Sequence, residues 1–181
     1  MPIAEWTALQ ERPIDGPIGF DLVESERVHV DMKPGFSTTI VIEVPPAMVF
    51  GFLADPLTAS VIDPAVMRYD PEGGTMGLGI RNHIHLRIMG VPIQMTSVTT
   101  AWEPGQRMEF RSIRPGRPVV GEATHRFEPS HHGTIYTWSM HFIPTGLGGR
   151  PIAALAAGAF QRNAREQQRR VKIVLEAARL S

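Results

Sequence analysis

The chain has 181 residues, no cysteine, and 18 basic residues balanced by 18 acidic ones. That length suits one domain with a sizeable core, and the balanced charge argues against a nucleic-acid partner. The absence of cysteine excludes disulfides, thiolate metal sites and cysteine nucleophiles, and it fits a reducing compartment.

Residues 1–36 are predicted to form an N-terminal extension that is loosely structured or contributes an edge strand. Prolines and glycines interrupt this stretch at short intervals, and only RVHVDM reads as a short strand. Its start is acidic and lacks the apolar run of a secretory signal, and no segment of the chain is apolar enough to span a bilayer. We therefore expect a cytoplasmic protein whose main domain covers residues 37–181.

The main domain is predicted to begin with the strand STTIVIEV, which is rich in β-branched residues and stops at two prolines. The second proline, Pro46, suits the first turn of a helix over PAMVFGFLAD, where apolar residues recur at helical spacing. A second short helix or turn is expected between Pro56 and Pro64. These elements lead into a region of strands.

Six strands are predicted in the middle of the chain, at residues 66–69, 78–89, 93–102, 107–114, 119–128 and 134–143. The turns between them are short and rich in glycine and proline, as hairpins require. Such connections leave no room for crossover helices, so the strands should form one antiparallel meander.

A long helix is predicted over residues 151–180, with apolar side chains along one face. Alanines crowd the first half of that face, whereas the second half carries the bulkier Val171, Val174 and Leu175. If the face lies across a curved sheet, the first half leaves space for a cavity and the second half closes the core. Tight packing along the whole helix is the alternative.

Three stretches resemble a known superfamily: STTIVIEVPPAMVFGFLADP, AWEPGQRMEF and THRFEPSHHGTIYTWSMHFIPTGLGG. With the order of the elements, they make residues 37–181 similar to the START-like, or SRPBCC, superfamily and its polyketide cyclase/dehydrase and lipid-transport group. The resemblance implies an α+β helix-grip fold, in which a curved antiparallel sheet of about seven strands wraps around a long C-terminal helix, with two short helices after the first strand. It also implies a hydrophobic small-molecule ligand between sheet and helix, although only some members are enzymes.

Strand alternation predicts which side chains face that space, because successive residues point to opposite sides of a sheet. The resulting lining is apolar and rich in methionine and aromatic residues, with a few polar groups to orient a ligand. For each polar group, a hydrogen-bonded position in the core is the alternative. The predicted ligand-binding residues are Asn82, Ile84, Leu86, Met108, Phe110, His125, Phe127, Tyr136, Trp138, Met140, Phe160 and Asn163.

The sequence gives little indication of catalysis, because it has no nucleophile elbow, P-loop, dinucleotide fingerprint or zinc-protease motif. The candidates for acid–base chemistry are His125 with Tyr136 or Asp63. A histidine in a semi-apolar cavity can have a pKa near the working pH, which is the reason for choosing His125. Residue type alone supports this assignment.

His83 and His85 share one face of a predicted strand, at a spacing that can hold a metal ion when a third ligand joins them. No glutamate follows, and the flanking Arg81 and Arg87 would repel a cation. A solvent-facing basic stripe is the better interpretation, and we predict neither a metal nor a cofactor.

Positive charge gathers in the helical segment RNAREQQRRVK, from Arg162 to Lys172, and a solvated helix face is its simplest explanation. Two alternatives stay open. The segment can pair with the acidic N-terminal stretch of the same chain or of a second copy in a homodimer, or it can make transient contact with an anionic membrane.

The sequence thus favours a domain that binds or transports a hydrophobic, lipid- or polyketide-like molecule without catalysis. A polyketide-type cyclase, aromatase or dehydratase that uses the polar cavity residues is the alternative, and a structural or assembly factor that uses the same groove for a partner is a third hypothesis. No nucleic-acid partner is expected. Polar side chains that converge in the cavity would favour the enzyme, and a uniformly apolar cavity would favour the carrier.

Overall fold

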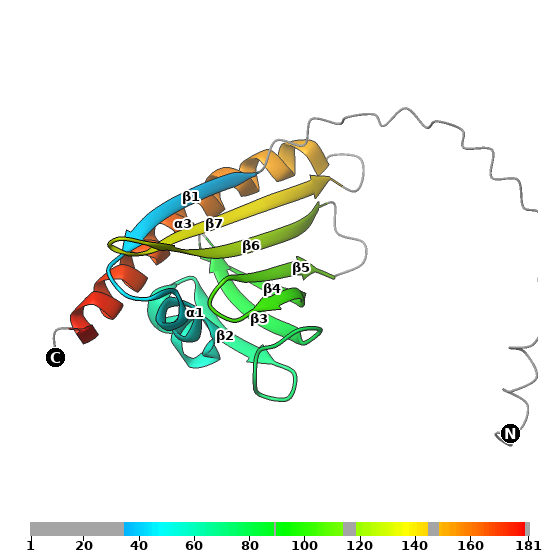
Figure 1. Cartoon of the computed structure of the whole chain (residues 1–181). Coiled ribbons are helices and arrows are strands. Elements are labelled where there is room, and N and C mark those ends of the chain that lie inside the picture. Colours follow the sequence, from blue (N-terminus) through cyan, green and yellow to red (C-terminus); the bar gives the residue numbers. More distant parts are fainter. Residues whose placement is uncertain (1–34, 89, 114–118, 145–148, 180–181) are drawn as a thin grey trace, which may run out of the picture. The chain divides into compact units, whose positions relative to one another are not determined.

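The computed structural model describes residues 35–88, 90–113, 119–144 and 149–179, all within one compact unit, Lys33–Ser181. Seven antiparallel strands form one sheet in the order β1-β7-β6-β5-β4-β3-β2, and a long helix, α3, crosses it (Figure 1). The predicted helix-grip fold is confirmed. Nearly all of the N-terminal extension predicted over residues 1–36 lies outside the described residues.

The first strand, β1 (Phe36–Ile42), begins one residue before its predicted start and pairs with β7 in the register Phe36↔Met140. The helix α1 (Pro46–Ala54) follows, with Pro46 in its first turn as expected. The second predicted helix is a 3₁₀ turn, η3 (Pro56–Thr58), that leads directly into α2 (Ala59–Ile62). Asp55 is the N-cap of η3, and its side chain accepts a hydrogen bond from the Leu57 backbone N–H at 2.9 Å.

The remaining strands form the meander that the short turns predict. They are β2 (Val66–Pro71), β3 (Arg81–Ile88), β4 (Val91–Glu103), β5 (Arg107–Ser112), β6 (Val119–Ser130) and β7 (Gly133–Pro144). The third strand starts three residues later than predicted, because Gly79 has a φ of 77° and belongs to the preceding turn. Irregular registers interrupt the ladders between β2 and β3 and between β4 and β5.

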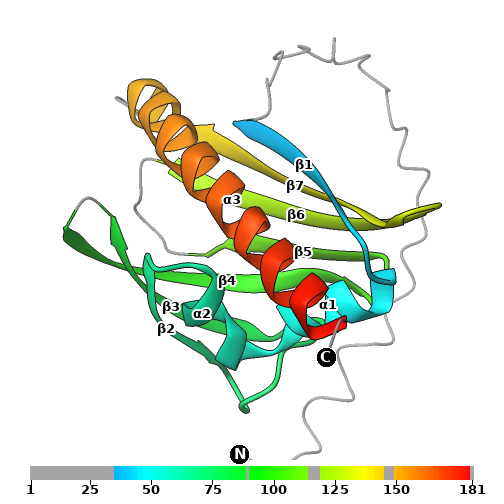
Figure 2. The same ribbon diagram turned by 90° about the vertical axis from the view of Figure 1, so that its left-hand side faces the viewer.

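The long helix α3 (Gly149–Arg179) packs mainly on β1 and β7, on the same side of the sheet as α2 (Figure 2). Val171 and Leu175, in its second half, are buried and close the core as predicted. Val174 was expected to do the same, but it is 37% exposed, because helical spacing turns it away from the sheet. Since α3 crosses the sheet diagonally, the inner face of β3–β6 lies open beside its first half.

At the other end of the sheet the core is tightly packed. Phe50 of α1 makes edge-on contacts with Trp102 and Phe127, at ring-centroid distances of 5.0 and 5.6 Å. Phe127 stacks on Tyr136 at 5.3 Å, and both are almost completely buried. This cluster ends the space under α3 at the α1 side.

Candidate ligand-binding cavity

A cavity of about 1080 Å³ lies between the inner face of the sheet and the first half of α3. Its floor comes from β3–β7, and its side wall comes from η3, α2 and β2. The residues that the helix contributes include Ala154, Ala156, Gly158 and Ala159, and these small residues leave space that larger ones would fill. The cavity predicted from the alanine-rich half of the helix is therefore present.

Nine of the twelve predicted ligand-binding residues line this cavity. Because strand alternation places them correctly, the inner residues of β3, β5, β6 and β7 lie on one continuous surface. They are Ile84, Leu86, Met108, Phe110, His125, Trp138, Met140, Phe160 and Asn163. Their role in binding a ligand stays a prediction.

The other three residues, Asn82, Phe127 and Tyr136, face the same side of the sheet but lie in the packed core. Phe127 and Tyr136 sit beneath α1, whose Phe50 fills the space that was assigned to a ligand. Asn82 is fully buried, and its side-chain N–H donates to the hydroxyl of Thr99 at 3.1 Å. For these residues, alternation indicated the correct face but not the end of the cavity.

His125 and Tyr136 are brought together as the sequence suggested, with His125 Nδ1 and the Tyr136 hydroxyl 2.8 Å apart. Burial lowers the pKa of His125 to about 3 and raises the pKa of Tyr136. His125 is therefore a neutral imidazole at neutral pH, and its pKa lies well below the working pH that was considered for it from the sequence. The ring also stacks on Trp138 at 5.2 Å and meets the edge of Phe110 at 5.8 Å.

Asp63 lies at the other wall of the cavity, away from the His125–Tyr136 pair that it was proposed to join. It follows α2, and its Oδ2 accepts a hydrogen bond from the Asn163 side chain of α3 at 2.7 Å. Its Oδ1 accepts from the Ala65 backbone N–H at 2.8 Å. Burial raises the pKa of Asp63, and these two hydrogen bonds together with the charge of Arg170 oppose part of that rise.

Sequence reasoning missed the contribution of β4, whose Ile93, Met95 and Ser97 also line the cavity. The same alternation rule would have found them, because they share the inner face of that strand. It also missed Tyr69 of β2, whose pKa is raised by burial. No sequence signal marks Tyr69, because its burial depends on how β2 closes the side of the cavity.

Three lining residues carry buried polar atoms with no hydrogen-bond partner among the described residues. They are the hydroxyl oxygen of Ser97, the indole Nε1 of Trp138 and the side-chain oxygen Oε1 of Gln167. Such atoms are uncommon in folded proteins, because an unpaired buried polar group costs about 1–3 kcal/mol. All three residues belong to the cavity wall, although the atoms themselves are almost completely covered by protein.

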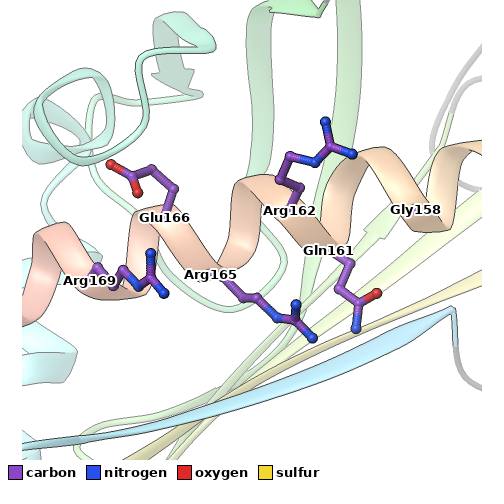
Figure 3. Close-up of a pocket in the computed structure, with 6 residues that line it drawn as sticks. All are labelled: Gly158, Gln161, Arg162, Arg165, Glu166 and Arg169. Atoms are coloured by element: carbon purple, nitrogen blue, oxygen red, sulfur yellow. The ribbon is translucent and has the colours of Figure 1, made fainter.

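A second, smaller hollow of about 420 Å³ lies on α3 itself (Figure 3). Arg162 and Glu166 extend to one side of the helix, and Gln161 and Arg165 extend to the other. Glu166 forms an exposed ion pair with Arg170 at 3.1 Å. A single helix supplies all the residues of this hollow, which is consistent with a solvated basic face and gives it no enclosed binding surface.

His83, the first of the two histidines considered for a metal, contacts Glu72 at 3.3 Å and Thr96 at 3.4 Å. The described residues contain no group of three or more histidine, cysteine, aspartate or glutamate side chains placed to hold a metal ion. Within the same part of the chain, no helix has the length and apolar character needed to cross a membrane.

Comparison with solved structures supports the fold. The di-domain aromatase/cyclase StfQ of the steffimycin biosynthetic pathway is 13% identical with a TM-score of 0.69, over 81% of this chain and 52% of StfQ. The ZhuI aromatase/cyclase from Streptomyces sp. R1128 is 17% identical with a TM-score of 0.66, over 78% and 92%. Ara h 8.0201 is 15% identical with a TM-score of 0.61, over 78% and 97%. This chain thus spans about half the length of StfQ.

No curated protein sequence is significantly similar to this chain. Residues 33–176, however, match the sequence family described as polyketide cyclase/dehydrase and lipid transport. That range covers the whole sheet and nearly all of α3, the elements that build the cavity. The chain therefore belongs to the polyketide cyclase/dehydrase and lipid-transport family.

Proposed function

We propose that this protein binds a hydrophobic small molecule in the cavity beneath α3 and acts as a carrier or sensor. The observation that carries the proposal is a space of about 1080 Å³ with a mainly apolar wall. Cavities of this size can bury most of the surface of a ligand, and the removal of apolar surface from water supplies the binding free energy. Membership of a family that includes lipid transport supports the same conclusion.

The polar groups of the cavity fit binding better than catalysis. His125 is neutral and its Nδ1 is already engaged by Tyr136, so it is a poor proton donor or acceptor at neutral pH. Both carboxylate oxygens of Asp63 accept hydrogen bonds from protein groups. These two sites lie on different walls, the sheet floor and the α2–α3 side, and so they do not converge on one reacting atom.

Native mass spectrometry of the gently purified protein, compared with its denatured mass, tests this function. We expect a defined small-molecule adduct on the wild-type chain that is released on denaturation. Ala156→Phe should remove the adduct, because Ala156 lines the cavity and a phenyl ring would fill part of it. Ala177→Phe, on an exposed part of α3, is the matched control and should keep it. An adduct that persists in Ala156→Phe would contradict the proposed site.

A polyketide-type cyclase, aromatase or dehydratase is the second candidate. The structural similarity to StfQ and ZhuI and the presence of the His125–Tyr136 pair favour it. A precursor of the released compound should then be converted to that compound, by ring closure or dehydration, when the precursor is incubated with fresh protein. If His125 takes part in that reaction, His125→Ala should abolish turnover and leave ligand affinity nearly unchanged. Equal loss of both would assign His125 to binding alone.

A further inference from the structure

Two rows of inward-facing residues carry the polar groups of the cavity floor. The first, which we call the serine row, runs from Asn82 on β3, which is buried outside the cavity lining, to the lining residues Ser97 on β4 and Ser112 on β5. The second, the histidine row, runs from Met108 on β5 through His125 on β6 to Trp138 on β7. Residues within a row are paired across neighbouring strands, so each row forms a line perpendicular to the strands.

The two rows lie at a fixed separation. Met108 and Ser112 are four residues apart on β5, and at about 3.3 Å per residue this places the rows about 13 Å apart. Between them lies a third row, in which the cavity-lining residues Phe110, Ala123 and Met140 are apolar. Thr99 on β4, which pairs with Phe110, is buried and does not line the cavity. Along the strands, the cavity floor therefore has polar residues in the serine row, apolar residues in the middle row and polar residues again in the histidine row.

The histidine row presents hydrogen-bond donors. The hydroxyl of Tyr136 is buried, and His125 Nδ1 is its only hydrogen-bond partner among the described residues. When that hydroxyl donates to Nδ1, the imidazole carries its proton on Nε2, which makes Nε2 a donor. Trp138 adds an indole N–H that has no partner in the described part of the chain, although the residue is only 7% exposed.

In the serine row, the Ser112 hydroxyl oxygen accepts from the Gly121 backbone N–H at 2.7 Å, whereas two other polar atoms have no partner among the described residues. The Ser97 residue is 3% exposed and its hydroxyl is unpaired within the described ranges. Asn82, its neighbour across the strands, is 0% exposed and has an unpaired side-chain oxygen Oδ1, whereas its amide N–H₂ is already used by Thr99. The two unpaired oxygens here, Ser97 Oγ and Asn82 Oδ1, are both acceptors, and of the two only Ser97 Oγ also carries a proton to donate. A ligand group that donates a hydrogen bond therefore suits this end.

We propose that the cavity selects an elongated, uncharged apolar molecule with a hydrogen-bonding oxygen near each end, one at each polar row. Ser97 on β4 lies two strands from His125 on β6 and three strands from Trp138 on β7. At about 4.8 Å per strand and about 13 Å along the strands, the backbone separations are about 16 and 19 Å. One oxygen accepts from Trp138 and His125, and the other, a hydroxyl, bonds to Ser97. This inference rests on the proposed binding function and adds the chemical class of its ligand. Neither polar row contains a lysine, arginine, aspartate or glutamate, so an uncharged end group suits both rows. The charged lining residues, Asp63, Arg87, Arg162 and Glu166, lie elsewhere in the cavity wall.

Straight-chain alcohols of matched length test the proposal. We would measure the affinities of 1,10-decanediol, which spans the two rows, of 1-decanol, which has one oxygen, and of 1,6-hexanediol, which is too short to reach both. Ser97→Ala should weaken binding of the long diol by about fivefold, the value of one hydrogen bond. It should leave 1-decanol and 1,6-hexanediol nearly unchanged, because these can place their oxygens elsewhere.

Two controls define the effect. Ser139→Ala makes the same substitution on β7, on the opposite face from Trp138 and Met140, and should leave the affinity for 1,10-decanediol unchanged. In the absence of any alcohol, Ser97→Ala should unfold at the same or a higher denaturant concentration than the wild type, because it removes an unpaired buried hydroxyl. A structural role for Ser97 would instead lower the stability of the variant.

The indole proton of Trp138 gives an independent readout. Its NMR signal is identified by its loss in Trp138→Phe, and it should move downfield when 1,10-decanediol binds, as a new hydrogen bond requires. If the long diol is no more sensitive to Ser97→Ala than 1-decanol and the indole signal stays in place, the two-ended ligand is excluded while cavity binding stands. If no alcohol in the series binds, both the two-ended ligand and the proposed function are overturned.

Discussion

His125, a partly buried histidine next to the buried Tyr136, makes the stability of this protein depend on pH in a defined direction. The pKa of His125 falls from its ordinary value of 6.5 to about 3, because burial disfavours the imidazolium. In the unfolded chain the imidazole binds a proton below pH 6.5, whereas the folded chain does not bind one until about pH 3. The unfolded state thus binds more protons between these values, and stability must decrease as the pH falls through that range.

The first prediction concerns this range. The wild-type free energy of unfolding should fall between pH 6.5 and about 3 more steeply than that of His125→Gln, which keeps a hydrogen-bond acceptor near Tyr136 but does not titrate. Above pH 6.5 the difference between the two proteins should stay constant. Urea unfolding at a series of pH values measures both. Parallel curves below pH 6.5 would mean that the imidazole is protonated as easily in the folded chain as in the unfolded one.

Gly133 is a residue whose identity is fixed by two separate constraints. Its φ of 122° is one that residues with a side chain rarely adopt. A Cβ at this position would also lie 2.3 Å from the Ile42 carbonyl oxygen and 2.8 Å from the Val44 backbone nitrogen. The β6–β7 turn therefore needs glycine to let the chain after β1 pass close beside it.

The second prediction separates these constraints. Gly74 also has a positive φ, of 81°, but no atom lies within 4 Å of its would-be Cβ. Gly74→Ala should cost about 1–3 kcal/mol from the backbone conformation alone, and Gly133→Ala should cost clearly more, because backbone atoms must also move. Chemical denaturation of both variants tests this order. Equal losses would show that the close contact at Gly133 relaxes without cost.

At the scale of elements, α3 is held to the sheet by polar contacts as well as by its apolar face. Gln168 is 2% exposed, and its side-chain N–H₂ donates to the carbonyl oxygens of Thr38 on β1 at 3.1 Å and Tyr136 on β7 at 3.3 Å. These bonds join the helix to two strands far apart in sequence. They lie in the second half of α3, next to the buried Val171 and Leu175, and so fix the helix where the core is packed.

The third prediction compares two neighbouring glutamines on this helix. Gln168→Leu keeps the approximate size of the side chain but removes both hydrogen bonds, so it should destabilise the fold by about 1–3 kcal/mol. Gln167→Leu is the matched control: its Oε1 is buried without a partner among the described residues, so the change should be neutral or stabilising. Urea unfolding of the two variants gives the comparison. A loss at Gln167 equal to that at Gln168 would show that the contacts of Gln168 contribute nothing specific.

Local patterns predicted the elements well, because β-branched runs, glycine–proline turns and one long amphipathic face each act over a few residues. Alternation also assigned Met108, Phe110 and Met140 to the inner face. It could not predict where the cavity ends, because α1 is distant in sequence from the strands it covers, and Phe50 buries Phe127 and Tyr136. The lowered pKa of His125 could not be predicted from the sequence for the same reason, because burial is a property of the assembled fold.

At the scale of the whole molecule, the described elements form a complete structural unit. The strand β1 is the first element of this unit, and its Phe36 is buried against Trp138 at a ring distance of 5.7 Å. The family match likewise begins at residue 33. We therefore expect the segment from Lys33 to Ser181 to fold without the residues before it, close to the domain boundary at residue 37 that the sequence indicated.

The last prediction tests that boundary with two truncations. A chain that starts at Lys33 should unfold cooperatively, with a free energy within about 0.5 kcal/mol of the full chain, because all of its strands are intact. A chain that starts at Ile40 should lose cooperative unfolding, because it lacks Phe36 and the Thr38 carbonyl that accepts from Gln168. Far-ultraviolet circular dichroism during thermal and urea unfolding distinguishes the two. If the Lys33 chain melts without cooperativity, the first 32 residues belong to the folding unit and the sequence boundary is wrong.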